Sequence, residues 1–259
     1  MTLSVTLLLV CAVSVAKGKL ILRNGRHESG FLATNNLITN GNDLPSYISI
    51  NWFTQKLDHF APNSDTWKQK YWVNTKYYKP GGPALLFIGG EGPTSRNWID
   101  ADLPGGVPNW LANAKLLNAI CFQLEHRYYG DSFPTADMST ANLKWLSSRQ
   151  ALADLAEFIQ GMNEKYGLDG SRWITIGGSY SGSLSAWARA KYPHLIDGAV
   201  ATSGPVLAKL NFSAYLEVAT TALAEKGSKD CVDSIAAATQ YIELLVGYGV
   251  GMDELKKTF

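Results

Sequence analysis

The stretch "WITIGGSYSGSLSAW", residues 173–187, passes from an apolar run through two glycines to Ser179. Its apolar run at 174–176 predicts a buried strand, a glycine pair follows, and the small residues after Ser179 lead into a predicted helix that ends before Pro193. A strand, a tight turn and a helix around a serine are the context of a nucleophile elbow, whose strained backbone lifts the hydroxyl above the sheet. We therefore predict that Ser179 is a catalytic nucleophile.

The surroundings of this serine predict how the turn works. At such a corner the backbone N–H of Tyr180 and the N-terminus of the helix face the place where an oxyanion forms. We expect Gly178, Ser181 and Gly182 to keep the turn tight, although Ser181 stands where the common G-x-S-x-G pattern has its second glycine. The alternative is a glycine-rich turn that binds a phosphate or only permits close packing. A Walker phosphate loop is excluded, because no Gly-Lys-Ser/Thr follows.

A second glycine-rich loop lies upstream, in "LLFIGGEGP", residues 85–93. There a predicted strand, Ala84 to Ile88, ends in four residues of which three are glycine. In α/β-hydrolases a glycine-rich loop after an earlier strand supplies the other oxyanion N–H, so Gly90 and Glu91 are candidate donors. As an alternative, the glycines make an ordinary strand-to-helix turn and Glu91 is a solvated loop charge.

The rest of the chain alternates predicted strands with predicted helices. Nearly continuous apolar runs predict strands buried on both faces, as in a parallel sheet, at 84–88, 118–124, 172–178 and 198–204. Alternating residues between Asn51 and Val73 predict antiparallel strands near a sheet edge. Helical spacing predicts helices at 108–117, 147–167 and 181–192, with Ser147 as N-cap and Gly167 as C-cap of the second. The fold class is therefore α/β, a mostly parallel sheet with helices on both faces.

The composition predicts a globular protein and limits the classes of partner that it could bind. The 259 residues are 46% hydrophobic and 17% charged, and the formal net charge is +1, so we expect no nucleic-acid partner. No stretch approaches the roughly 20 apolar residues of a membrane span. No histidines, cysteines or carboxylates recur at metal-ligand spacing, so we expect neither a metal nor another cofactor. The oligomeric state stays open.

Several short signals predict export. The apolar run Leu3 to Val15 and the small residues at its end predict a signal peptide over residues 1–16, although no Lys or Arg precedes the run; the alternative is a buried N-terminal segment. Of the two cysteines that follow, Cys121 is expected to be a buried thiol, and Cys231 to be able to pair with a partner outside this chain. Asn211 begins an N-x-Ser/Thr sequon and is a candidate glycosylation site.

Four longer segments together resemble one peptidase family. They are "FTQKLDHF" (53–60), "LEHRYYGDSFP" (124–134), "LKWLSSRQALADLAEFI" (143–159) and "GGSYSGSLSAWARAKYPHLIDGAVATSGPV" (177–206). They resemble the serine peptidases that include lysosomal Pro-X carboxypeptidase, dipeptidyl peptidase II and thymus-specific serine protease. Their sequence is most similar to that of the thymus-specific branch. The resemblance runs from Trp52 to about Tyr215.

The resemblance implies both a fold and an activity. It implies an α/β-hydrolase core with a helical insertion after the sixth strand, and it makes Ser179 the nucleophile. It also implies that the partners are peptide substrates, cleaved near a chain end and typically after proline, in the lysosome or the secretory pathway. The change to an Ala- and Leu-rich texture after Pro205 agrees with such an insertion. We therefore expect 17–205 to be the N-terminal part of the peptidase domain and 206–259 the beginning of a helical cap.

The histidines do not supply a general base for Ser179. A hydrolase triad runs Ser, then Asp or Glu, then His, and of His27, His59, His126 and His194 only the last follows the serine. At 1.5 Å per helical residue His194 lies about 20 Å away. We expect His126 to be structural, and the triad acid and histidine to be missing, so that this chain is part of a longer hydrolase and has little or no peptidase activity alone.

Two other functions stay open at this point. The fold hosts many chemistries, so another acyl hydrolase, an esterase or a lipase, is one alternative. The other is a secreted, non-catalytic binding protein that keeps a hydrolase core.

Overall fold

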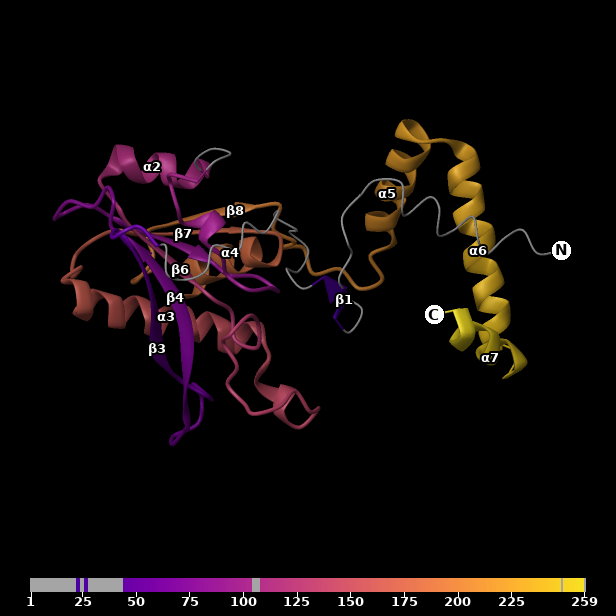
Figure 1. Cartoon of the computed structure of the whole chain (residues 1–259), viewed down its shortest axis with the longest axis horizontal. Helices are drawn as coiled ribbons and strands as arrows, with labels where there is room; N and C mark the ends of the chain where they lie inside the picture. Colours follow the sequence, from indigo (N-terminus) through magenta and orange to yellow (C-terminus); the bar gives the residue numbers. More distant parts are fainter. Residues whose placement is uncertain (1–21, 24–25, 28–43, 104–107, 248, 259) are drawn as a thin grey trace. The chain divides into compact units, whose positions relative to one another are not determined.

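The computed structural model describes residues 22–23, 26–27, 44–103, 108–247 and 249–258. The predicted signal peptide, residues 1–16, lies outside these. The described residues form two compact units, which divide after Leu207 (Figure 1). None of the helices in the described part of the chain is both long and apolar enough to cross a membrane.

The first unit is built on a six-stranded sheet with the order β3-β4-β6-β5-β7-β8. The strands are β3 (Ile48–Lys56), β4 (Thr66–Asn74), β5 (Ala84–Ile88), β6 (Ile120–Leu124), β7 (Trp173–Gly178) and β8 (Gly198–Thr202). β4 runs antiparallel to both of its neighbours, whereas β6, β5, β7 and β8 are mutually parallel. The antiparallel opening and the parallel centre are as predicted. A separate two-stranded ladder joins β1 (Leu22–Arg23) to β2 (Arg26–His27).

Three α-helices connect the parallel strands: α2 (Asn109–Leu117), α3 (Ser148–Tyr166) and α4 (Tyr180–Lys191). Two short 3-10 helices, η1 (Arg96–Trp98) and η2 (Asn142–Trp145), lie in the loops. The predicted caps of α3 are confirmed, because the Ser147 hydroxyl accepts a hydrogen bond from the Gln150 N–H and Gly167 ends the helix with a φ of 62°. Pro193 follows shortly after α4. A proline disfavours helical backbone at the residue before it, so α4 ends there as predicted.

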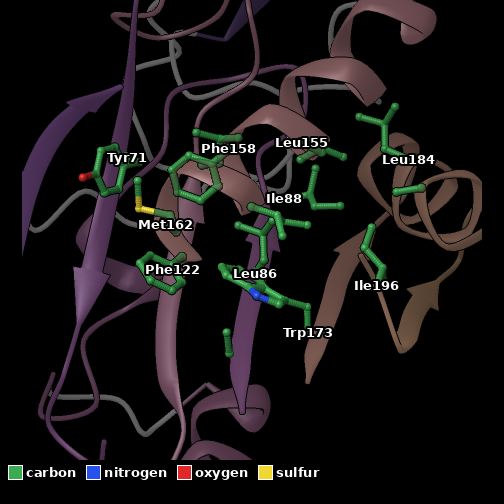
Figure 2. Packing of buried hydrophobic residues seen from close by; sticks show 14 of the residues in the cluster. Tyr71, Leu86, Ile88, Phe122, Leu155, Phe158, Met162, Trp173, Leu184 and Ile196 are labelled. Atoms are coloured by element: carbon green, nitrogen blue, oxygen red, sulfur yellow. The ribbon is translucent and has the colours of Figure 1, made fainter. Parts of the chain in front are cut away.

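The helices cover both faces of the sheet. α3 and α4 pack on one face, in a cluster that includes Tyr71, Leu86, Phe122, Phe158 and Trp173 (Figure 2). α2 packs on the other face, where Leu111 and Ala114 join Leu85 and Cys121. Neighbouring residues of one strand, such as Leu85 and Leu86, thus serve opposite cores, as the alternation of side chains along a strand requires. This arrangement confirms the predicted α/β-hydrolase core.

β8 does not match the prediction of a strand buried on both faces. Four of its five residues are exposed, and Val200 keeps 48% of its surface accessible. The reason is its position, because β8 is the edge strand of the described sheet and pairs with β7 on one side only. The apolar sequence identified the strand correctly but overestimated its burial.

The second unit is helical, as the composition predicted. It contains α5 (Ser213–Lys226), α6 (Lys229–Gly247) and α7 (Gly249–Thr258). Large apolar side chains of α5 and α6 are exposed, among them Leu216, Val218 and Leu244. Asn211 lies exposed just before α5, and Cys231, near the start of α6, is a partly exposed free thiol. Cys121 is buried in the first unit as predicted, and burial raises the pKa of its thiol.

We predict that the core around α3 dominates the stability of the first unit. The Phe158 ring is fully buried and makes edge-to-face contacts with Phe53, Tyr71 and Phe122. Phe158→Ala should lower the free energy of unfolding by about 3–5 kcal/mol, because it removes apolar area and leaves a cavity. The control is Leu116→Ala, at a side chain 79% exposed, which should stay within about 0.5 kcal/mol. Urea unfolding measures both, and equal losses would contradict this assignment of the core.

Candidate active site

Ser179 occupies the corner between β7 and α4 in a strained conformation. Its φ is 58° and its ψ is −130°, a region that residues other than glycine rarely adopt. Its backbone N–H donates to the Thr202 carbonyl at the end of β8 at 3.0 Å, and its own carbonyl accepts from the Ser183 N–H at 3.1 Å. The residue is exposed, and its hydroxyl does not cap the helix. The backbone of a nucleophile elbow is therefore present.

Two glycines, Gly177 and Gly182, make this corner sterically possible. A Cβ on Gly177 would lie 2.1 Å from the Ser181 carbonyl oxygen, and a Cβ on Gly182 would lie 2.8 Å from that of Thr202. The expectation that Gly178 keeps the turn tight is wrong, because the nearest atom to a Cβ there is 3.9 Å away. The close approach falls one residue earlier, where the strand passes beneath the first turn of α4.

Ser181 replaces the second glycine of the common motif and has a role of its own. Its hydroxyl is buried, donates to the Gly178 carbonyl at 2.8 Å and accepts from the Gly178 N–H at 3.1 Å. A hydroxyl with one donor and two acceptor sites satisfies both backbone groups of that residue. The departure from the motif therefore stabilises the turn.

The two candidate oxyanion elements lie side by side. A Cβ on Gly90 would be 3.8 Å from the Ser181 hydroxyl oxygen, which places the loop after β5 against the first turn of α4. The Gly89 N–H donates to the Leu124 carbonyl at 2.8 Å and fixes the start of the loop. Among the described residues the N–H groups of Gly90, Glu91 and Tyr180 have no acceptor. The Glu91 side chain is exposed.

His126 contacts the residue that follows the serine. Its Nδ1 lies 2.7 Å from the Arg127 carbonyl oxygen and its Nε2 lies 3.0 Å from the Tyr180 hydroxyl. Burial lowers the pKa of His126 to about 4, and burial also raises the pKa of the Tyr180 phenol. No local sequence pattern predicts this contact, because it joins residues 54 positions apart.

The other described histidine side chains lie elsewhere. His59 Nε2 is 2.7 Å from Asp154 Oδ1 in a buried contact. His194 lies beyond the far end of α4 and contacts the ring of Tyr192. No hydrogen bond joins the Ser179 hydroxyl to a histidine anywhere in the described residues. The described histidine side chains therefore have other partners than this serine.

Buried charges hold the loops around this corner. The Asp154 carboxylate on α3 accepts two hydrogen bonds from the Arg127 guanidinium, each 2.7 Å long. The Glu125 carboxylate accepts from the backbone of Thr94 and Asp131 and from the hydroxyl of Ser132. These contacts connect the loops after β5 and β6 to α3. In the region that the structure describes, no cluster of three or more His, Cys, Asp or Glu could hold a metal ion.

The family model for the serine carboxypeptidase S28 peptidases matches residues 55–259. The chain belongs to the serine carboxypeptidase S28 family. The match includes β7, the Ser179 corner and the helices of the second unit. The resemblance seen in the sequence is thereby confirmed.

Individual S28 relatives are similar over most of this chain. Thymus-specific serine protease of Mus musculus is 39% identical over 205 residues, 76% of this chain and 39% of the relative. Its Homo sapiens counterpart is 35% identical over 239 residues, 88% and 45% of the two chains. Lysosomal Pro-X carboxypeptidase of Homo sapiens is 35% identical over 243 residues, 86% and 46%. The chain thus spans less than half the length of these relatives.

The neighbouring glycines Gly177 and Gly178 provide a matched test of the geometry of the Ser179 corner. Gly177→Ala should lower the free energy of unfolding by about 2–4 kcal/mol, because a backbone carbonyl has no room to move away from the new methyl group. Gly178→Ala should change it by less than about 1 kcal/mol, because its methyl group meets only ordinary contacts. Thermal and urea unfolding measure both variants. A larger loss for Gly178→Ala would contradict the observed packing of β7 under α4.

Proposed function

We propose that this chain carries the nucleophile and the oxyanion-binding half of a serine exopeptidase. In this reaction Ser179 Oγ attacks a peptide carbonyl, the hydroxyl proton passes to the leaving amine through a base, and water then hydrolyses the acyl-enzyme. The observation that carries the proposal is the Ser179 backbone, with its φ of 58° beside a Tyr180 N–H that has no protein acceptor among the described residues. Membership of the S28 family supports it.

The oxyanion donors would come from two places in the fold. The Tyr180 N–H lies at the N-terminus of α4, where the helix dipole favours negative charge. The N–H of Gly90 or Glu91 would supply the second donor, since the loop after β5 lies against the same turn. Loss of one such donor typically costs about 10²–10³ in kcat.

The triad acid and histidine would come from sequence outside these 259 residues. The described histidines do not reach Ser179, and the S28 relatives are more than twice as long as the matched segments. Without a base a serine hydroxyl is a weak nucleophile, so these residues alone should turn over little or no peptide. The unit beyond Leu207 would then begin the helical cap, with the peptidase domain preceding it over residues 17–205.

We infer the class of substrate and the location from the names of two relatives. Proteins named thymus-specific serine protease and lysosomal Pro-X carboxypeptidase point to peptides as substrates, with proline near the cleaved bond and action at a chain end. Processing of residues 1–16 as a signal peptide and glycosylation at the exposed Asn211 would fit a lysosomal or secreted protein.

The proposed function is tested by supplying the missing half. We would join residues 17–259 to the C-terminal part of human thymus-specific serine protease and assay proline-containing dipeptide substrates beside short acyl esters. The fusion should cleave the dipeptide substrates, and Ser179→Ala should lower kcat by about 10⁴-fold or more. The control, Ser139→Ala, changes an exposed serine of the loop before η2 and should have no effect.

Three other outcomes of the fusion assay would each contradict the proposed function. Cleavage of esters alone would identify an esterase. A folded fusion that cleaves neither class would identify a binding protein, and activity that survives Ser179→Ala would exclude this serine as the nucleophile.

A further inference from the structure

The imidazole of His126 bridges two segments that meet at the Ser179 corner. It follows the end of β6, is only 5% exposed, and takes no part in the chemistry proposed above. Its ring lies 5.4 Å from the ring of Tyr180 and 5.3 Å from that of Tyr129, measured between centroids. A buried imidazole with polar contacts at both nitrogens is a specific arrangement, because each contact constrains which nitrogen carries the proton.

The hydrogen-bond partners assign the tautomer. The Arg127 carbonyl oxygen, 2.7 Å from Nδ1, can only accept, so Nδ1 carries the proton. With a pKa lowered to about 4 by burial, the ring is neutral at pH 7 and Nε2 is an acceptor. The Tyr180 hydroxyl at 3.0 Å must therefore donate to Nε2. Its raised pKa keeps the phenol protonated and able to do so.

The contact reaches the reacting groups through Tyr180. Tyr180 is the first residue of α4 and directly follows Ser179, and its N–H is the proposed oxyanion donor. The Tyr180 hydroxyl is hydrogen-bonded to His126. Arg127, which follows His126 in the sequence, donates hydrogen bonds to both carboxylate oxygens of Asp154. The side chain of Tyr180 thus contacts a segment that is itself hydrogen-bonded to α3.

We propose that His126 is a positioning residue of the Ser179 site, which accepts the hydrogen bond of the Tyr180 hydroxyl and so holds the Tyr180 N–H in place beside the serine. The use of that N–H as an oxyanion donor rests on the proposed function. The hydrogen bond between His126 and Tyr180, and the ordering of the Tyr180 backbone that it causes, do not depend on the proposed function. Both can be measured in this chain without any turnover.

The first measurement reads the imidazole. In a long-range ¹H–¹⁵N spectrum of the ¹⁵N-histidine-labelled chain at pH 7, His126 should show a proton on Nδ1 and none on Nε2. Tyr180→Phe keeps the ring but removes the donor, so it should shift the Nε2 resonance of His126 and leave Nδ1 unchanged. A proton on Nε2, or no shift in Tyr180→Phe, would overturn the proposal.

The second measurement reads the backbone of Tyr180 by ¹⁵N-tyrosine relaxation. The amide order parameter should be near the rigid value of about 0.85 in the unchanged chain and fall below about 0.6 in His126→Leu, which keeps bulk without an acceptor. His126→Gln, whose amide oxygen can accept the hydrogen bond in place of Nε2, should restore the rigid value. This variant can also be measured if His126→Leu does not fold.

The Tyr166 amide at the end of α3 is the internal control and should not change in any variant. An unchanged Tyr180 amide in His126→Leu, or an equal fall at Tyr166, would show that His126 does not position Tyr180. Neither readout involves the serine hydroxyl, so Ser179→Ala should leave both as they are. If only the fusion assay fails, the proposed peptidase function is refuted and the positioning role of His126 stands. If only these two NMR measurements fail, the positioning role is refuted and the proposed function stands.

Discussion

The left-handed φ of Ser179 is the constraint on which the rest of the site depends. A residue with a Cβ held in this region costs about 1–3 kcal/mol and persists only where the surroundings impose it. Here the Ser179 N–H is bonded to Thr202 at the end of β8, Ser181 holds both backbone groups of Gly178, and Gly177 and Gly182 allow β7, α4 and β8 to approach closely. The backbone groups of Ser179 and Gly178 are thus bonded, whereas the neighbouring Tyr180 N–H has no acceptor among the described residues, and Ser179 itself is exposed.

The loops around that corner are held by buried charges. Replacing one member of a buried ion pair typically costs about 3–5 kcal/mol, since it leaves the other charge unpaired. Arg127 and Asp154 form such a pair, and Glu125 accepts hydrogen bonds from the loop after β5 and from its own loop. The glycine loop and Tyr180 therefore both depend on the segment directly after β6, which lies in one of the four stretches of family resemblance.

Local signals in the sequence predicted much of this. The elbow, the strand runs and the caps of α3 are patterns within a few residues, and they were recovered, as were the buried Cys121 and the helices after Pro205. The role of Gly177 and the hydrogen bonds of the Ser181 hydroxyl to Gly178 were not predicted, because they depend on where α4 crosses the strand. The exposure of β8 was missed, because burial is set by neighbours and not by the apolar run. The His126–Tyr180 and His59–Asp154 contacts join residues 54 and 95 positions apart, and no local pattern specifies such pairs.

A crystal structure of the expressed chain would show whether its fold imposes the elbow on Ser179. We expect a Ser179 φ near 58°, a hydroxyl that caps no helix, and a Tyr180 N–H without a protein acceptor. A Ser179 with negative φ, continuous with α4 and bonded into its first turn, would show that the corner is an ordinary helix start and not a nucleophile elbow.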